Sequence, residues 1–90
     1  MNQEEQPYIR HCSFCEQGML RFMCCQECEA VSAVCDECEL LWSDVAEAAR
    51  NPEAKSDGSF PTCPDCKNLQ ARWERLDAET IKKMNLDGLV

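Results

Sequence analysis

Eight of the nine cysteines in the chain form four pairs in which two residues separate the two thiols. The pairs are Cys12/Cys15, Cys25/Cys28, Cys35/Cys38 and Cys63/Cys66. Two cysteines at this spacing on a tight turn can direct both sulfur atoms at one ion, and two such turns complete a tetrahedral thiolate site. The spacing therefore predicts two metal sites. Zn²⁺ is the expected ion because it favours closed thiolate sites and needs no redox chemistry.

Disulfide and redox chemistry are the competing interpretations of this spacing. A disulfide-bonded secreted domain predicts an even cysteine count and an export signal, whereas the count is nine and residues 1–7 lack the basic and apolar regions of a signal peptide. A redox-active Cys-x-x-Cys would be a single motif beside a βαβ pattern. Iron remains an alternative ion, because Cys63-Pro-Asp-Cys66 resembles a rubredoxin turn, although Lys67 stands where glycine is usual. We expect two Zn²⁺ in a cytoplasmic protein.

The elements that must position these thiols are short. Residues 19–24 alternate, with Leu20 and Phe22 on one face, and residues 30–34 are rich in valine, so both segments are expected as strands. The Cys25/Cys28 pair lies between them and is expected in the turn of a β-hairpin.

Two or three helices are expected after the hairpin. Apolar residues recur at four-residue spacing within 36–50, which predicts an acidic helix that Asn51-Pro52 would end. A second helix is expected to open at the 63–66 pair, with Leu69, Trp73 and Leu76 on one face. A third is expected over 78–84, capped by Asp77.

The order of a cysteine turn, a hairpin and a helix resembles a treble clef, and the interleaved pairs with a final Cys-Pro-x-Cys resemble the RING and FYVE cross-brace families over residues 12–66. This resemblance implies a small metal-stabilised α+β fold in which Cys12, Cys15, Cys35 and Cys38 bind one Zn²⁺ and Cys25, Cys28, Cys63 and Cys66 bind the other. The hairpin supports this pairing, because strands of about six residues would hold its turn about 20 Å from its base. Sequential pairing, which gives two tandem zinc ribbons, is the alternative.

The same resemblance bears on function. RING domains bind ubiquitin-conjugating enzymes, so it implies a RING-like adaptor in a protein-modification pathway as an alternative function. RING domains usually include a histidine ligand, whereas all eight candidates here are cysteines. FYVE domains bind an acidic lipid head group through a basic run, and Gln26, Glu27 and Glu29 stand at that place here, so lipid binding does not carry over.

Two further residues are possible ligands. Cys24 could replace Cys25, and His11 could replace a thiolate of the neighbouring pair. We expect Cys24 to be a small apolar strand residue with a free thiol and His11 to be a surface residue.

The chain of 90 residues is long enough for one small domain whose core alone would be marginal. We expect a flexible N-terminal segment at 1–10, a zinc-binding domain at 11–76 with a mobile loop at 51–62, and a short helix and tail at 77–90. No apolar run approaches the roughly 20 residues needed to span a bilayer.

Charge narrows the class of partner. The chain has 17 acidic and 9 basic residues, a formal net charge of -8, and residues 26–60 hold nine acids against two bases, a local net charge of -7. Nucleic acids and acidic membranes require clustered Lys and Arg, and only a weak stripe of Lys67, Arg72 and Arg75 is present. A basic protein is the expected partner. Its expected contacts are Asp36, Glu37, Asp44, Glu47 and Trp73.

No catalytic chemistry is expected. Closed four-thiolate sites leave no position for a reactive water, and the chain has no His-Glu-x-x-His motif or phosphate-binding glycine loop. We therefore expect a non-catalytic structural zinc protein that acts as an acidic protein–protein interaction module, one form of which is an inhibitor or immunity protein that covers a basic partner. A nucleic-acid-associated zinc ribbon is the third function considered. The sequence does not set the oligomeric state.

Overall fold

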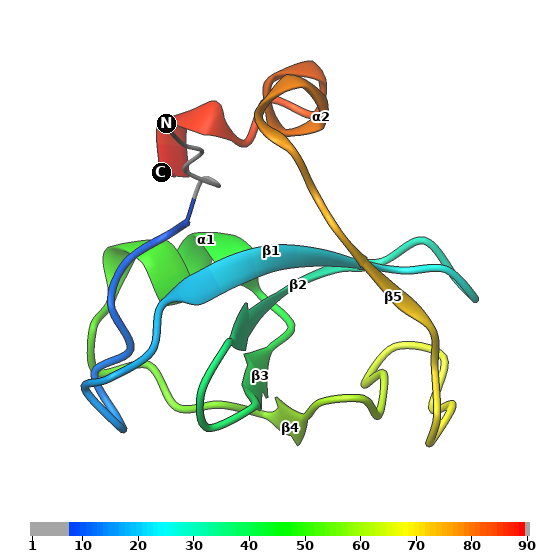
Figure 1. The fold of residues 1–90 in the computed structure, drawn as a ribbon, viewed down its shortest axis with the longest axis horizontal. Coiled ribbons are helices and arrows are strands. Elements are labelled where there is room, and N and C mark those ends of the chain that lie inside the picture. Colours follow the sequence, from blue (N-terminus) through cyan, green and yellow to red (C-terminus); the bar gives the residue numbers. More distant parts are fainter. Residues whose placement is uncertain (1–7, 90) are drawn as a thin grey trace.

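A computed structural model of the chain describes residues 8–89, which form a small α+β structure around one antiparallel sheet (Figure 1). Its strands are β1 (Leu20–Cys25), β2 (Val31–Cys35), β3 (Leu40–Trp42), β4 (Gly58–Ser59) and β5 (Trp73–Arg75). Its helices are α1 (Val45–Arg50), α2 (Ala78–Lys83) and a short 3-10 helix (Asp87–Leu89). None of the helices in this part of the chain is long and apolar enough to cross a membrane.

The β1–β2 hairpin is the centre of the sheet, whose strand order is β4-β3-β2-β1-β5. Its register places Leu20 opposite Cys35 and Cys24 opposite Val31. The expected hairpin is thus confirmed, with each strand one residue later than the apolar pattern indicated. The register follows from burial, because it directs Leu20, Phe22 and Ala33 into one core.

One buried cluster, here called the main core, joins elements from both ends of the described chain. Its buried members are Ile9, Cys12, Leu20, Phe22, Ala33, Cys35, Trp42, Ala48, Leu76 and Ile81. Figure 1 shows α1 and α2 on one side of the β1–β2 hairpin. Ile9 lies in the segment 1–10, which we expected to be flexible, and Ile81 lies in the expected short helix and tail at 77–90; both side chains are buried. Residues 1–7 lie outside the described part of the chain.

The prediction of an acidic helix over 36–50 is wrong for the first half of that segment. The third cysteine pair leads into β3, and only Val45–Arg50 is helical. Leu41 and Trp42 are adjacent strand residues, so their side chains point to opposite faces of the sheet; both are buried, which means that both faces are covered at this point. Asp44 begins α1 by accepting a hydrogen bond from the Glu47 amide at 3.0 Å, and the helix ends before Asn51. A treble clef is therefore not confirmed.

The helix expected from Cys63 is also wrong, since the chain forms a turn, a loop and then β5. Trp73 lies opposite Cys25 on the edge of the sheet. The third expected helix is confirmed as α2, and its start has a clear local cause. The carboxylate of Asp77 accepts a hydrogen bond from the Thr80 amide at 2.8 Å.

The segment 51–62, expected as a mobile loop, is tied to β3 at several points. Strand β4 places Ser59 opposite Leu40. The indole N–H of Trp42 donates to the carbonyl oxygen of Ala54 at 2.9 Å, and the amide of Ser43 donates to the Asp57 carboxylate at 2.9 Å. These bonds hold the segment against β3 and the residue that follows it.

Candidate metal centres

The structure brings the eight paired cysteines into two groups of four. Tetrad 1 comprises Cys12, Cys15, Cys35 and Cys38, and tetrad 2 comprises Cys25, Cys28, Cys63 and Cys66. Within each tetrad all four sulfur atoms lie within 4.8 Å of one another. This is the interleaved grouping, so the sequential pairing into two tandem ribbons is wrong.

Two sulfur–sulfur distances are the same in both tetrads. In tetrad 1 the sulfur atoms of Cys12 and Cys38 are 3.9 Å apart and those of Cys15 and Cys35 are 3.6 Å apart. In tetrad 2 the corresponding distances are 3.9 Å for Cys25–Cys66 and 3.6 Å for Cys28–Cys63. A tetrahedral ion with Zn–S bonds of about 2.3 Å requires sulfur atoms about 3.8 Å apart. All nine cysteines are free thiols, so each tetrad fits one tetrahedral metal ion.

The residue after each cysteine pair closes the turn that presents the thiols. Its amide donates to the carbonyl oxygen of the first cysteine, as in Glu16 to Cys12 (3.0 Å), Glu29 to Cys25 (2.7 Å), Glu39 to Cys35 (3.2 Å) and Lys67 to Cys63 (2.9 Å). All four residues have φ between 60° and 68°, the left-handed region that glycine adopts without strain. None of the four is glycine. Sequence reasoning noted only that Lys67 stands where glycine is usual, and it missed the other three positions, whose fixed place after each pair was the only signal.

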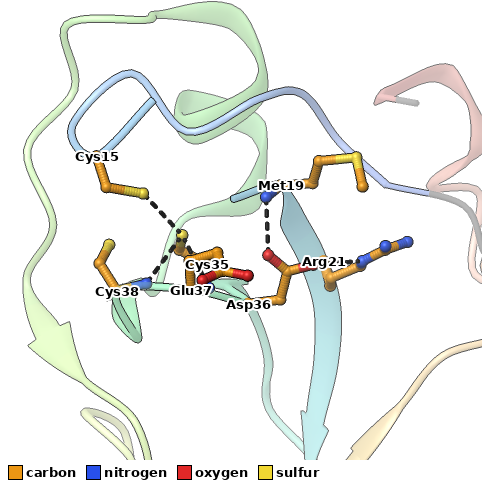
Figure 2. Close-up of polar contacts among 7 residues, drawn as sticks. All are labelled: Cys15, Met19, Arg21, Cys35, Asp36, Glu37 and Cys38. Carbon is orange, nitrogen blue, oxygen red and sulfur yellow. Dashed lines mark hydrogen bonds and ion pairs between the residues drawn. The ribbon is translucent and has the colours of Figure 1, made fainter. Parts of the chain in front are cut away.

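Backbone N–H groups also point at the thiols of tetrad 1 (Figure 2). The amides of Glu37 and Cys38 each donate to the sulfur of Cys35 at 3.4 Å. Burial raises the pKa of Cys35 to about 12, whereas hydrogen bonds from the backbone of Gln17 and Gly18 lower the pKa of Cys15 to about 7. The thiols of one tetrad therefore differ in acidity, and a metal ion that binds all four as thiolates must displace protons.

The two tetrads differ in how the rest of the molecule supports them. Cys12 and Cys35 of tetrad 1 belong to the main core. Tetrad 2 lies in a separate small core, which consists of buried Cys25, Cys63 and Ala71 with Trp73 packed against it. In Figure 1 the 12–15 turn (blue) and the 63–66 turn (yellow) lie towards opposite ends of the long axis. The hairpin thus connects two separate centres.

Cys24 and His11 lie outside both tetrads. Cys24 is partly buried against the main core, and burial raises the pKa of its thiol. His11 is exposed, with its ring 5.6 Å from that of Tyr8. Both placements agree with the expectation that neither residue is a ligand.

The acidic residues expected to bind a partner do not share one helix face. Asp36 accepts a hydrogen bond from the Met19 amide at 2.9 Å and pairs with Arg21 at 3.3 Å (Figure 2). Asp44 caps α1. Asp36 and Asp44 therefore have structural roles. Glu37 and Glu47 are exposed, and the carboxylate of Glu47 accepts a hydrogen bond from the side-chain amide of Asn51 at 3.0 Å.

Trp73 and the basic stripe are also arranged differently from the helical expectation. The indole N–H of Trp73 donates to the carbonyl oxygen of Pro61 at 2.8 Å. Arg72 pairs with Glu27 at 3.0 Å, and the Gln26 amide donates to the Arg72 carbonyl oxygen at 2.7 Å. These contacts hold the segment before β5 against the hairpin turn, so Arg72 and Trp73 support tetrad 2.

Comparison of the chain with protein-family models, with curated proteins and with solved structures gave no significant match.

Proposed function

We propose that the chain is a non-catalytic zinc module in which two Zn²⁺ ions hold the fold and an acidic surface binds a basic protein partner. The observation that supports the first part is the pair of four-thiol groups, in each of which all sulfur atoms lie within 4.8 Å of one another. Four thiolates fill the coordination shell of a zinc ion and leave no position for water or substrate. The ions would therefore act structurally.

The architecture supports a large role for the metal in folding. Tetrad 1 links residues from 12 to 38, and tetrad 2 links residues from 25 to 66, so the two sites together hold most of the described chain. Structural zinc sites contribute about 10–16 kcal/mol in model peptides, whereas small domains have net stabilities of about 5–15 kcal/mol. A fold with so small a core should require its metal.

Metal analysis tests this part directly. The purified chain should contain two zinc ions, and Cys28→Ser should contain one. Cys24→Ser is the matched control and should retain two, because Cys24 lies outside both tetrads. One zinc or none in the unaltered chain contradicts the proposal. Two iron ions per chain would confirm the two sites but show that iron, not zinc, is the bound metal.

Charge supports the second part of the proposal. Residues 26–60 have a local net charge of -7 within a chain of net charge -8. Eight thiolates add -8 and two Zn²⁺ add +4, which brings the formal charge to about -12. Such a surface attracts a basic partner over several ångströms. Salt screens this attraction, so binding should weaken as the salt concentration rises.

A pull-down at two salt concentrations tests the partner class. The combined variant Glu37→Gln, Asp44→Asn and Glu47→Gln removes three charges, and Asn keeps a good cap on α1. The matched control removes three charges near the C-terminal end with Glu74→Gln, Glu79→Gln and Asp87→Asn. Asp36 stays unaltered because it holds Met19 and Arg21.

We expect recovery of a basic protein in an amount that falls as the salt concentration rises. Its recovery should also fall more with the first combined variant than with the control variant. Recovery of a ubiquitin-conjugating enzyme would instead support a RING-like adaptor. Recovery that nuclease abolishes would support a nucleic-acid-associated protein. Equal recovery with both variants contradicts the proposed acidic surface.

A further inference from the structure

A groove lies between the first cysteine pair and the segment that follows α1. Its volume is about 450 Å³, within the range of ordinary ligand sites. Phe14 and Pro52 line it together with Leu40, Trp42 and Ala54. These five apolar residues are the majority of the nine that line the groove, so it can accept an apolar group from a partner.

Phe14 is the most unusual part of this groove. Its side chain is 74% exposed although it is a large aromatic residue, and it lies between Cys12 and Cys15 of tetrad 1. A metal ion bound to those two thiols would fix the backbone on both sides of the ring. Rigid exposed aromatic residues lose little conformational entropy on binding and are frequent binding hot spots.

Hydrogen bonds hold the two sides of the groove together. The hydroxyl of Ser13 donates to the carbonyl oxygen of Pro52 at 2.6 Å, which connects the cysteine turn to the segment after α1. The indole N–H of Trp42 donates to Ala54 at 2.9 Å, and Trp42 itself is only 4% exposed. The groove is therefore formed before any partner binds.

The charge around the groove indicates which occupant it favours. Glu53 and Lys55 both line it and offset each other, so the excess of negative charge comes from the chain as a whole, whose formal net charge is -8. Glu16 directly follows the cysteine pair that carries Phe14. When it holds Zn²⁺, a tetrad of four thiolates carries a formal charge of -2.

We propose that this groove binds a basic segment of a protein partner, which inserts one or two large apolar side chains beside Phe14 and places Lys or Arg residues around the rim. The inference rests on the proposed function, because it assigns a binding site for the basic partner. It is also narrower, since a basic partner could bind the acidic surface without using the groove.

A random 12-residue peptide library displayed on phage, selected against the full zinc-loaded chain, tests the proposal. The enriched peptides should combine a large apolar residue with neighbouring Lys or Arg. Their affinity should fall about tenfold for Phe14→Ser. Leu69→Ser is the matched control, because Leu69 is 72% exposed near the other tetrad, and it should leave the affinity unchanged.

Zinc content shows whether Phe14→Ser keeps tetrad 1 intact. A second measurement avoids substitution altogether: addition of an enriched peptide to the unaltered chain should shift the NMR signals of the Trp42 indole and the Ala54 amide. Absence of enrichment, enrichment of acidic peptides, or equal binding to Phe14→Ser overturns the proposal. If the groove fails while a basic partner is still recovered in the salt-dependent pull-down, the proposed function stands and the partner binds elsewhere.

Discussion

Gly18 lies so close to Cys35 that no side chain fits between them. A Cβ atom on Gly18 would be 2.7 Å from the sulfur of Cys35, 2.8 Å from a carboxylate oxygen of Asp36 and 2.8 Å from Cβ of Glu37. The carbonyl oxygen of Gly18 also accepts a hydrogen bond from the Cys12 amide at 2.8 Å. The two cysteine pairs of tetrad 1 therefore meet at a glycine.

Gly18→Ala should destabilise the zinc-loaded chain by about 1–3 kcal/mol, because buried overpacking forces its neighbours to move. It should also weaken metal binding at tetrad 1 and leave tetrad 2 unchanged. Urea unfolding measures the stability, and ¹¹³Cd NMR of the cadmium-loaded chain resolves the two sites. Gly88→Ala is the matched control, since a Cβ there meets no atom within 4 Å. Equal effects of the two substitutions would contradict this account of Gly18.

Lys67 provides a test of the turns that present the thiols. Its φ is 65°, which is unfavourable for a residue with a side chain by about 1–2 kcal/mol. Lys67→Gly should therefore be more stable than Lys67→Ala by about 1 kcal/mol. The alanine variant controls for the lost charge and side chain, and thermal unfolding of the zinc-loaded proteins gives the comparison. A glycine variant less stable than the alanine variant would mean that this turn is not strained.

The sequence predicted the metal centres better than the elements between them. The cysteine spacing is a local requirement of the turn, so the four pairs were predictable from residue positions. The hairpin length favoured the interleaved grouping but left the sequential one as an alternative. The start of α2 was predictable because the Asp77 cap is also local. Residues 36–44 were not, because Leu41 and Trp42 suit a strand or a helix equally until the neighbour is known. Pairing with β2 at Val34 and Ala33 decides for a strand.

The unequal support of the tetrads predicts an order of metal loss. Cys28 of tetrad 2 is exposed. The small core around tetrad 2 has three buried residues, whereas tetrad 1 belongs to the main core, which has ten buried residues. A chelator should therefore remove the metal of tetrad 2 first and release the segment before β5. The rest of the sheet should persist until tetrad 1 is emptied.

Indole NMR signals can follow these two steps in the unaltered chain, which has two tryptophans. The Trp73 indole bonds to Pro61 beside tetrad 2, and the Trp42 indole bonds to Ala54 beside tetrad 1. The Trp73 signal should move to its unfolded position at a lower chelator concentration than the Trp42 signal. Trp73→Phe assigns the two signals. Simultaneous loss of both native signals would show that the centres form one cooperative unit.

Ser32 is fully buried in β2, and its hydroxyl has no hydrogen-bond partner among the described residues. A buried hydroxyl without a partner carries a desolvation cost of about 1–3 kcal/mol, and alanine occupies nearly the same space without it. Ser32→Ala should therefore stabilise the zinc-loaded chain by about 1 kcal/mol in urea unfolding. Ser43→Ala should have the opposite sign, because the Ser43 hydroxyl donates to the Asp57 carboxylate. Loss of stability in Ser32→Ala would show that the hydroxyl is satisfied in solution, for instance by a buried water molecule.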